Sequence, residues 1–482
     1  MKEDSTYIRP RSVQKRGESH YHIEINETED ALVVSGPDSR MFEGSPQTRE
    51  GVCVKRCPLT VENAGIIMSL FDYTKPKRHK GRAVTIGLGD RLGIASGGHI
   101  ELIRDLDVFP VLAQQSIREL NLTGRNYGEV LAAAAWAVFS EGYAKGYGAD
   151  GDHLKTLDEI KYALNAGFSM ITLDCSEHIR NDLASASQES VDALYERLDD
   201  HVRRDMEDRY PGREFPIEGD VSIWFAPEDF RRMAMIYLPA IIHAEKMYEA
   251  AVKSAGVDYE ISIDETLTTT TPQSHYFVAD ELIRRGVEIT SLAPRFVGEF
   301  QKGIDYRGDI PDFRRDFELH AKIAAHFGYK ISVHSGSDKF SIFPSVNALT
   351  GGRYHLKTAG TNWLEAVRVI AQKSPGLYRE IHAFALDALP EAKKYYHITA
   401  NTANIEHSDR VSDDGLASYL DKDDSRQVLH ITYGLVLQAL KADGTPLFRD
   451  RIYDVLRKHD TDYRAGLRKH IGKHLERLGY TV

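Results

Sequence analysis

The chain has 482 residues, of which 42% are hydrophobic and 28% are charged, and its formal net charge is −11 at pH 7. This composition predicts a soluble globular protein, and the lack of an apolar run as long as a bilayer-spanning helix excludes an integral membrane protein. The negative charge is spread along the chain, which argues against nucleic acid binding. We therefore expect neither nucleic acid nor membrane as a partner.

The start of the chain and its cysteine content indicate the cellular compartment. Residues Met1 to Ser5 are charged and lack the apolar segment of a secretory signal. Cys53, Cys57 and Cys175 are too few to scaffold a chain of this length with disulfides. Cys53 and Cys57 have no second pair of ligands nearby, so we interpret them as ordinary thiols. Together these features predict a cytoplasmic protein.

Eight short apolar stretches alternate along the chain with segments of helical periodicity, and each runs into polar or charged residues. Strands that alternate with helices predict parallel βαβ units, and eight such units predict an α/β fold with a closed (β/α)8 TIM-type barrel. An open, doubly wound sheet is the alternative. The eight stretches are Ala83–Leu88, Val108–Ala113, Tyr147–Ala149, Met170–Leu173, Tyr259–Ile263, Val287–Leu292, Tyr329–Val333 and Arg353–Leu356.

Two of the intervening segments carry helix end signals. Asn126–Glu129 has the spacing of a capping box and opens onto the alanine-rich run Val130–Phe139. Phe313–Phe327 places aromatic and alanine side chains on one face and stops at Gly328, a C-cap residue. Both segments are therefore predicted to be helices on the outside of the barrel.

The domain organisation follows from the extent of these units. Residues 80–389 are assigned to the catalytic barrel, with a long charged insertion over 176–257. Residues 1–79 are predicted to form a small N-terminal accessory α+β module with short strands such as Tyr21–Ile25. Residues 390–482 are predicted to form a C-terminal helical extension packed on the barrel.

In such a barrel the C-terminal ends of all strands open on one mouth, so residues far apart in sequence converge there. The most informative run is His334–Ser341, which directly follows the apolar stretch Tyr329–Val333 and combines an imidazole, hydroxyls, an acid and a base. The residues predicted to meet at the mouth are Asp90, Gln114, Asp152, His153, Asp174, Glu265, Arg295, His334 and Lys357.

Several nucleotide and hydrolase motifs are missing. The sequence has neither a G-x-x-x-x-G-K-[ST] loop nor a G-x-S-x-G elbow. Gly87–Gly93 contains a G-x-G, but its spacing departs from the dinucleotide fingerprint, and residues 94–99 do not predict a clear helix. We therefore interpret this segment as a loop of the mouth, which leaves metal or acid/base chemistry.

Imidazoles and carboxylates at four strand ends suit a divalent metal ion: His153, Glu265, Glu299 and His334. Such ligands do not distinguish zinc, manganese, nickel and iron. Asp152 and Glu265 can also act as an acid/base pair. Their chemistry is thus compatible with a metal-assisted proton transfer.

Two further features concern neighbouring residues of the mouth. For Asp264 we favour a structural role as the N-cap of the following helix. An anionic substrate would need local cations, and arginine binds carboxylates through two hydrogen bonds. The cations predicted on the rim are Arg91, Arg118, Arg295, Lys339 and Lys357.

Seven segments carry a resemblance to a known family. They are Gly89–Gly93, Ala113–Ser116, Gly148–His153, Asp264–Thr266, Arg295–Glu299, His334–Ser341 and His355–Thr361. Together they resemble the tagaturonate/fructuronate epimerase family. The resemblance runs from about Gly81 to the histidine-rich C-terminal helices, whereas the residues before it match poorly.

The resemblance implies a metal-dependent interconversion of D-tagaturonate and D-fructuronate in hexuronate catabolism, with related members acting on tagatose and fructose. Carried over by motif, Asp152 would be the general base and Glu265 the general acid. The divalent metal would be held by His153, Glu299 and His334. The substrate-binding residues would be Asp90, Gln114, Arg295, Lys339, His355 and Lys357, with Arg295 or Lys357 on the substrate carboxylate.

The inverted carbon is β to the ketone, so simple enolisation cannot invert it. Retro-aldol cleavage with rotation and re-addition is one route, and prior migration of the carbonyl through an enediol is another; in both, a metal would polarise oxygen while a carboxylate moves the proton. A class II aldolase, which Thr358–Thr361 keeps open, and a sugar-binding protein are the alternatives. The sequence also leaves open the metal, the preference for uronate or ketose, and whether the protein is a homo-oligomer.

Overall fold

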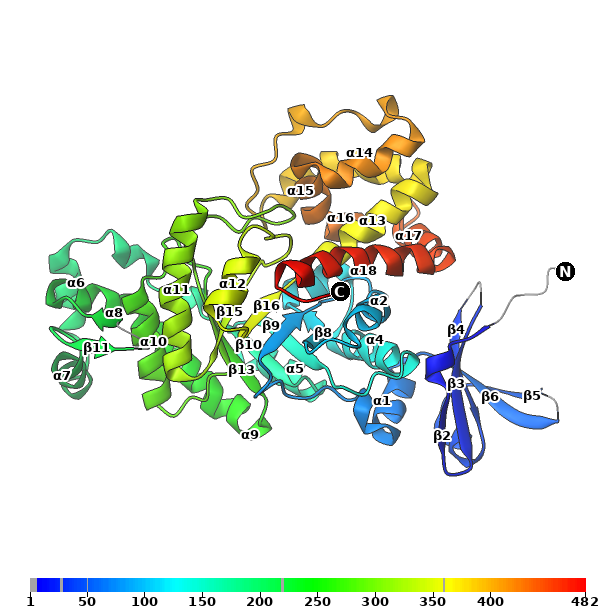
Figure 1. Ribbon diagram of the computed structural model, residues 1–482, viewed down its shortest axis with the longest axis horizontal. Coiled ribbons are helices and arrows are strands. Elements are labelled where there is room, and N and C mark those ends of the chain that lie inside the picture. The colour runs from blue at the N-terminus through cyan, green and yellow to red at the C-terminus, as the bar shows by residue number, and fades with distance from the viewer. Residues whose placement is uncertain (1–6, 27–28, 50, 218–220, 359) are drawn as a thin grey trace.

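A closed barrel of eight parallel strands forms the centre of the computed structural model, which describes residues 7–26, 29–49, 51–217, 221–358 and 360–482 (Figure 1). Around the barrel the strands are β7 (Val84–Gly87), β8 (Phe109–Gln115), β9 (Gly148–Leu154), β10 (Met170–Asp174), β13 (Asp258–Ile263), β14 (Ser291–Pro294), β15 (Lys330–Val333) and β16 (Tyr354–Lys357), which pairs with β7. The predicted barrel is confirmed, and an open sheet is excluded. The charged start Met1–Ser5 and Ala359 of the last motif lie outside the described residues.

Two strands differ from the prediction by more than two residues at one end, and the others agree more closely. Strand β9 continues past Ala149 to Leu154, so Asp152 and His153 lie within its last residues rather than in a loop. Strand β14 begins at Ser291 and not at Val287. The backbone N–H of Val287 donates to the carbonyl of Leu282, which makes this residue part of the end of the preceding helix.

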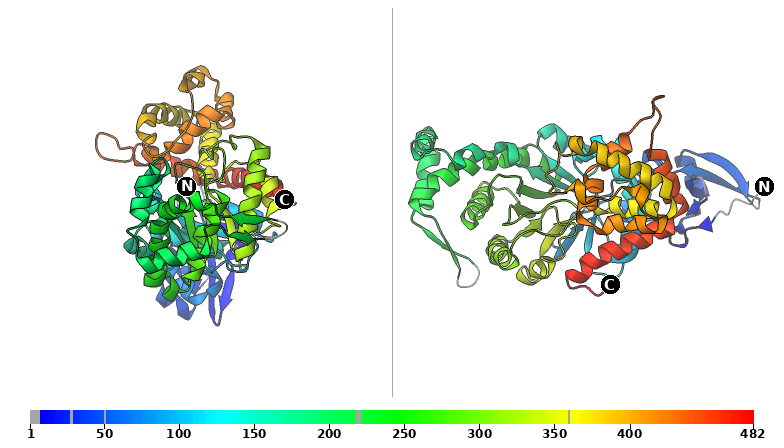
Figure 2. Two further views of the ribbon diagram at one scale, coloured as in Figure 1. Left: turned by 90° about the vertical axis from the view of Figure 1, so that its left-hand side faces the viewer. Right: turned by 90° about the horizontal axis from the view of Figure 1, so that it is seen from above.

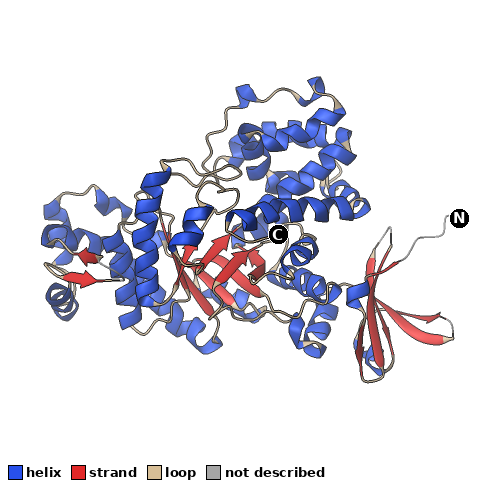
Figure 3. Cartoon of the chain, in the orientation of Figure 1, coloured by secondary structure: helices blue, strands red, loops and turns tan. Residues whose placement is uncertain are grey.

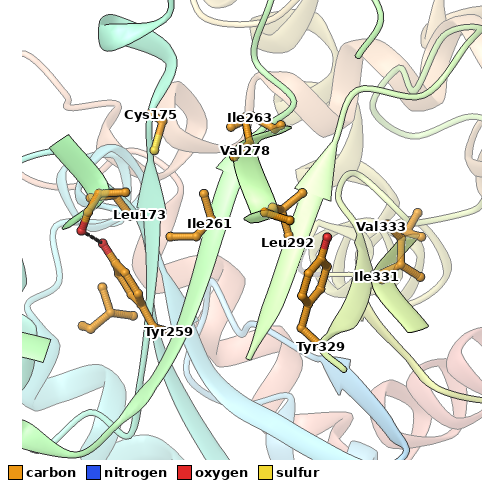
Figure 4. Packing of buried hydrophobic residues seen from close by; sticks show 14 of the residues in the cluster. Leu173, Cys175, Tyr259, Ile261, Ile263, Val278, Leu292, Tyr329, Ile331 and Val333 are labelled. Carbon is orange, nitrogen blue, oxygen red and sulfur yellow. Dashed lines mark hydrogen bonds between the residues drawn. The ribbon is translucent and has the colours of Figure 1, made fainter. Parts of the chain in front are cut away.

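On most barrel strands, apolar residues that face outward alternate with polar residues that face the lumen. Ile261, Leu292 and Ile331 point outward into the core between strands and helices (Figure 4). Their neighbours Glu260 and Ser291 point into the barrel, where the Ser291 hydroxyl donates to the Glu260 carboxylate. Because side chains in a strand alternate with a period of two, the same sequence supplies an apolar coat and a polar lumen.

The helices cover the barrel on its outside. They are α2 (Ser96–Ile103), α3 (Ile117–Thr123), α4 (Tyr127–Ser140), α5 (Leu157–Asn165), α10 (Pro272–Arg284), α11 (Ile310–Phe327) and α12 (Phe343–Leu349). Both predicted end signals are present: Asn126 and Glu129 form a capping box on α4, and Gly328 adopts a φ of 81° after α11. Local sequence and tertiary structure therefore agree on these helices.

Helix α2 was not expected from its sequence, which contains Gly97 and Gly98. Both glycines lie under the last helix of the chain, and a Cβ on Gly97 would lie 2.6 Å from the guanidinium of Arg464. The preceding loop is held by Asp90, whose carboxylate accepts the backbone N–H of Ala95 at 2.6 Å. Close packing thus favours glycine here, against its low helix propensity.

The insertion between β10 and β13 forms one end of the long axis (Figures 1 and 2). It contains α6 (Gln188–Tyr195), α7 (Asp200–Arg209), the hairpin strands β11 (Glu214–Pro216) and β12 (Ser222–Trp224), and α8 (Pro227–Met247). Its longest helix, α8, packs against α10 of the barrel coat. The insertion is therefore attached to the barrel by a helix pair.

An antiparallel sheet in the order β1-β3-β4-β6-β5 lies at the opposite end (Figure 3). Its strands are β1 (Tyr7–Ile8), β2 (Gln14–Arg16, paired with β3), β3 (Ser19–Ile25), β4 (Asp30–Ser35), β5 (Ser45–Arg49) and β6 (Val52–Pro58), and helix α1 (Val61–Leu70) follows. The predicted strand Tyr21–Ile25 is part of β3. Tyr21 and Ile23 share a small core with Trp136 and Phe139 of α4, which joins the sheet to the barrel.

The C-terminal helices form a second unit above the barrel in Figure 1. They are α13 (Thr361–Lys373), α14 (Pro375–Ala392), α15 (Asp423–Ile431), α16 (Tyr433–Gln438), α17 (Arg449–Lys458) and α18 (Asp460–Arg477). Helix α13, which follows the eighth strand, packs into this unit with its own core around Trp363. Helix α18 instead returns to the barrel, where Ile471 and Leu475 join the main core beside α2 and α12. No described helix is long and apolar enough to cross a bilayer.

The aromatic cluster on α11 allows a test of the packing. Phe317 is fully buried and its ring lies 5.1 Å from that of Phe296 and 5.3 Å from that of Phe313. We expect Phe317→Ala to lower the free energy of unfolding by about 3–5 kcal/mol through the cavity it leaves. Ile242→Ala, at a side chain that is 48% exposed, should cost less than about 1 kcal/mol. Urea unfolding followed by circular dichroism measures both, and equal losses would contradict the packing.

Candidate active site

A polar pocket opens at the C-terminal ends of the barrel strands and is covered on one side by the C-terminal helical unit. Six of the residues predicted for the mouth line it: Gln114, Asp152, His153, Glu265, His334 and Lys357. A larger cavity, between α8 and the loop after β13, is mainly apolar, and only Asp229 and Arg232 among its lining residues carry charge. The polar pocket is therefore the candidate active site.

Three potential metal ligands meet at this pocket. One ligand atom each from His153, Asp264 and His334 lies within 4.8 Å of the others. The Nδ1 atom of His334 lies 3.1 Å from Oδ1 of Asp264, and it is buried without an aligned hydrogen-bond partner in the described part of the chain. Two imidazoles and a carboxylate that converge in this way match the ligand set of a divalent transition metal.

Besides Asp264, each of the two imidazoles has its own carboxylate partner, which orients the ring. Nδ1 of His153 lies 2.8 Å from Oδ1 of Asp152, and Nε2 of His334 lies 2.7 Å from Oε1 of Glu260. These contacts leave Nε2 of His153 and Nδ1 of His334 for a ligand. Carboxylates that hold the outer nitrogen of a metal-binding histidine fix both its tautomer and its ring orientation.

Lys357 neutralises the carboxylates beneath the pocket. Its Nζ lies 2.6 Å from Asp152, 2.9 Å from Glu260 and 3.1 Å from Asp150. Burial disfavours the charged lysine, but the three carboxylates outweigh it and hold the Lys357 pKa well above its usual value. Burial likewise opposes ionised Asp152, yet Lys357 and His153 hold its pKa well below the usual range. The pocket floor is thus a network of charged groups.

Backbone strain is concentrated around the same pocket. Among the described residues, the non-glycine positions with positive φ are His153 at 53°, Ser335 at 49° and Asp338 at 63°. Such conformations are costly for residues with a Cβ and persist where the surroundings enforce them. All three lie on β9 or in the loop after β15, the two segments that supply the histidines.

Comparison with known proteins agrees with this geometry. A family model described as tagaturonate epimerase matches residues 9–478. The chain belongs to this family. It is 39% identical over 474 residues to the tagaturonate/fructuronate epimerase of Thermotoga maritima, covering 97% of this chain and 96% of the relative. The glycerol-complexed crystal structure of the fructuronate-tagaturonate epimerase UxaE of Cohnella laeviribosi superposes with a TM-score of 0.95 at 50% identity, covering 98% of this chain and 96% of the other.

The predicted family resemblance is therefore confirmed, and the protein is an epimerase, an enzyme of the isomerase class. The native crystal structure of the Cohnella enzyme also has a TM-score of 0.95, at 49% identity. One expectation was wrong: the family match begins at residue 9 and includes the N-terminal sheet, which the sequence motifs did not cover.

Glu299, expected as a metal ligand of the epimerase, lies outside the histidine cluster. Its side chain is exposed, and its backbone N–H donates to the carbonyl of Arg307 at 2.8 Å in an isolated β-bridge. The carboxylate beside the two histidines belongs to Asp264. Asp264 does not cap the following helix, because α10 begins at Pro272 with Thr271 as its N-cap.

Two residues predicted to bind substrate have hydrogen-bond partners within the protein. The carboxylate of Asp90 accepts the backbone N–H groups of Gly93 and Ala95 at 2.7 and 2.6 Å. The ammonium of Lys339 donates to backbone carbonyls, among them those of Gln301 at 2.8 Å and Ile304 at 2.6 Å. Neither side chain lines the pocket.

His355 and Arg295 are also displaced from the pocket wall. His355 lies in the lumen below it, where Nδ1 is 2.7 Å from the Thr85 hydroxyl and the ring stacks on His79. Arg295 does not line the pocket, and its backbone pairs with Thr270 at 2.9 and 3.0 Å. His355 lies within β16, before its last residue, whereas Arg295 directly follows β14 and is held there by its backbone pairing with Thr270.

Glu260 and Lys302 were missed by the sequence analysis. Glu260 is a carboxylate in the middle of the buried strand Asp258–Ile263, and a charge inside an apolar stretch was the available signal. Lys302 lies in the irregular segment after β14, and nothing in its local sequence distinguishes it from a surface lysine. The alternation of side chains along a strand can reveal a residue such as Glu260, but it cannot reveal Lys302, which lies outside any strand.

The role of Asp90 can be tested through stability. We expect Asp90→Ala to lower the free energy of unfolding by about 1–3 kcal/mol, because buried N–H groups of the loop lose their acceptor. Asp105→Ala, at an exposed position, is the matched control. Differential scanning calorimetry measures both. An Asp90→Ala protein with unchanged stability and a raised KM would return Asp90 to substrate binding.

Proposed function

We propose that this epimerase interconverts D-tagaturonate and D-fructuronate with the help of a divalent metal ion held by His153, Asp264 and His334. The observation that carries the proposal is the convergence of these three ligand atoms, within 4.8 Å, inside the pocket at the barrel mouth. The names of the Thermotoga and Cohnella relatives support the substrate pair. The location is proposed to be the cytoplasm, which suits the free thiols of Cys53, Cys57 and Cys175.

The residues present fit the metal. The ligand nitrogens are the ones left over after Asp152 and Glu260 have bound the opposite ring atoms, and Nδ1 of His334 has no aligned protein partner in the described chain. When bound, a metal ion at this position supplies a Lewis acid for a substrate oxygen. This ligand set differs from the one carried over by motif in having Asp264 in place of Glu299.

Asp152 and Glu265 are proposed to move protons at opposite parts of the pocket. Asp152 lies on its floor, and the neighbouring Lys357 keeps the carboxylate ionised, which is the form that accepts a proton. Glu265 lies on the loop after β13 with an exposed side chain, from which it can exchange protons with solvent. Asp152 and Glu265 thus supply a base on the pocket floor and an acid in contact with solvent.

On the retro-aldol route, all bond changes stay within the sugar, and Asp152 holds the transferred proton. The Asp152 carboxylate takes the proton from the hydroxyl on the carbon to be inverted. The bond between that carbon and the carbon α to the ketone breaks, its electron pair forms an enolate, and the hydroxyl-bearing carbon becomes an aldehyde. Rotation of the aldehyde and re-formation of the bond return the proton to oxygen with inverted configuration. Lys357, which hydrogen-bonds Asp152, stabilises the ionised carboxylate before the proton is taken and after it has been returned.

The acid/base roles lead to a kinetic prediction. We expect Asp152→Asn and Glu265→Gln to lower kcat by roughly 10²–10⁴-fold, because each removes a positioned proton-transfer group. Glu299→Gln is the matched control, since its carboxylate lies outside the pocket and should leave kcat unchanged. Conversion of D-fructuronate followed by NMR measures all three. A loss at Glu299 equal to that at Asp152 would support the ligand set carried over by motif instead.

The metal leads to a second prediction. Chelator-treated protein should lose conversion of D-fructuronate and recover it with single divalent metals. Asp264→Asn and His334→Gln should weaken metal binding to the stripped protein by at least roughly 10-fold, measured by calorimetric titration without substrate. Full activity after complete metal removal would overturn the metal site.

The same reaction in deuterated water separates the remaining alternatives. Deuterium at the inverted carbon would favour direct proton transfer there, and its absence would favour the retro-aldol route. Release of free three-carbon fragments would identify an aldolase, and binding without conversion a sugar-binding protein. Parallel reactions with tagatose and fructose would show whether neutral ketoses are also substrates.

A further inference from the structure

One side of the pocket carries cations without a carboxylate partner. The ammonium of Lys302 donates to the Ser335 hydroxyl at 2.8 Å, and no carboxylate oxygen of a described residue lies within 4.0 Å of it. Arg118, on the first turn of α3, lies with its guanidinium 4.9 Å from the ring centroid of Tyr396 and likewise forms no ion pair with a described residue. Both line the pocket.

The third cation of this wall is different. Arg91 lies 3.0 Å from the carboxylate of Glu119 and 3.8 Å from the ring centroid of Tyr433, so its charge is already paired. Burial lowers the pKa of Lys302, and the charges of Arg118 and Arg91 lower it further. An anion placed between Lys302 and Arg118 would relieve this repulsion.

The segment that carries Lys302 is fixed on both sides. Lys339 donates to the carbonyls of Gln301 and Ile304, which flank Lys302. From the C-terminal unit, Arg426 donates to the carbonyl of Gly303 at 2.8 Å. The ammonium is thus held in place before any ligand arrives, which lowers the entropic cost of binding one.

The position of Lys302 also suits the substrate. Its partner Ser335 directly follows His334, so the ammonium lies beside the histidine–carboxylate cluster in the same pocket. In a 2-ketohexuronate, the carboxylate and the ketone lie on opposite sides of the inverted carbon. A sugar whose ketone end is at the histidines can therefore direct its carboxylate to another part of the pocket wall.

We propose that Lys302, assisted by Arg118, binds the carboxylate of the hexuronate and sets the preference for a uronate over a neutral ketose. The proposal rests on the proposed function of this pocket. It replaces Arg295 and Lys357 as the expected carboxylate ligands, because Arg295 is outside the pocket and Lys357 is paired with three carboxylates. Lys339 becomes a positioning residue that acts through the carbonyls of Gln301 and Ile304 on either side of Lys302.

The test compares a uronate with a ketose in the metal-loaded enzyme. We expect Lys302→Met to lower kcat/KM for D-fructuronate by roughly 10–100-fold, the effect of losing one charge-assisted hydrogen bond, and to lower that for D-fructose much less. Lys302→Arg should restore part of the uronate activity. Lys155→Met removes the same charge at an ammonium outside the pocket, 2.8 Å from Glu177, and should not change the ratio of the two substrates.

A merely structural role of Lys302 predicts a different result. If the lysine only holds Ser335, then Lys302→Met should lower the turnover of both sugars equally, and Ser335→Ala should reproduce its effect. Equal losses of turnover for both sugars in Lys302→Met, or the same effect in Ser335→Ala, would overturn the carboxylate site.

Calorimetric binding of D-fructuronate to each variant separates this failure from that of the proposed function. Unchanged affinity in Lys302→Met contradicts the carboxylate site, whatever the reaction. Tight binding that depends on Lys302, without conversion to tagaturonate by the parent protein, contradicts the epimerase reaction alone.

Discussion

The ion pairs of Lys357 are the interaction on which the site depends. Asp150, Asp152 and Glu260 enter the lumen from two strands, and a single buried ammonium lies within 3.1 Å of all three. Buried carboxylates are costly without a partner, and the cost falls when a cation and hydrogen bonds satisfy them. Because Asp152 and Glu260 in turn orient the two histidines, Lys357 couples the charge balance of the lumen to the geometry of the pocket.

The fold was predictable because it is encoded in local patterns. Apolar stretches that alternate with capped helices specify parallel units, and closure into a barrel follows from their number. The strand ends were less predictable. An extension of β9 by five residues moved Asp152 and His153 from a loop into a strand, and a helix end at Val287 delayed β14. The extension of β9 arises from pairing with the neighbouring strands β8 and β10, whereas the late start of β14 arises from a local hydrogen bond that prolongs the helix end.

The residues of the candidate site also fall into those that the sequence placed at the mouth and those that it did not. Residues at strand ends, such as Gln114, His153 and His334, were placed correctly at the mouth because strand direction determines their position. Glu299 was not, because the segment after β14 turns away in a β-bridge with Arg307. Lys302 reaches the pocket only through contacts with Lys339 and the C-terminal unit, which lie far away in sequence. Irregular segments take their course from packing partners that the local sequence does not reveal.

The return of α18 to the barrel has a consequence for how the chain matures. The barrel strands are complete at Lys357, but the surface beside α2 and α12 is covered only by the last helix. His474 of that helix also accepts the backbone N–H of Asp338 in the loop after His334. During synthesis on the ribosome, the barrel therefore has an uncovered apolar flank and an active-site loop without its His474 contact until α18 has been made. The pocket is therefore complete only after Asp460–Arg477 has folded back onto the barrel.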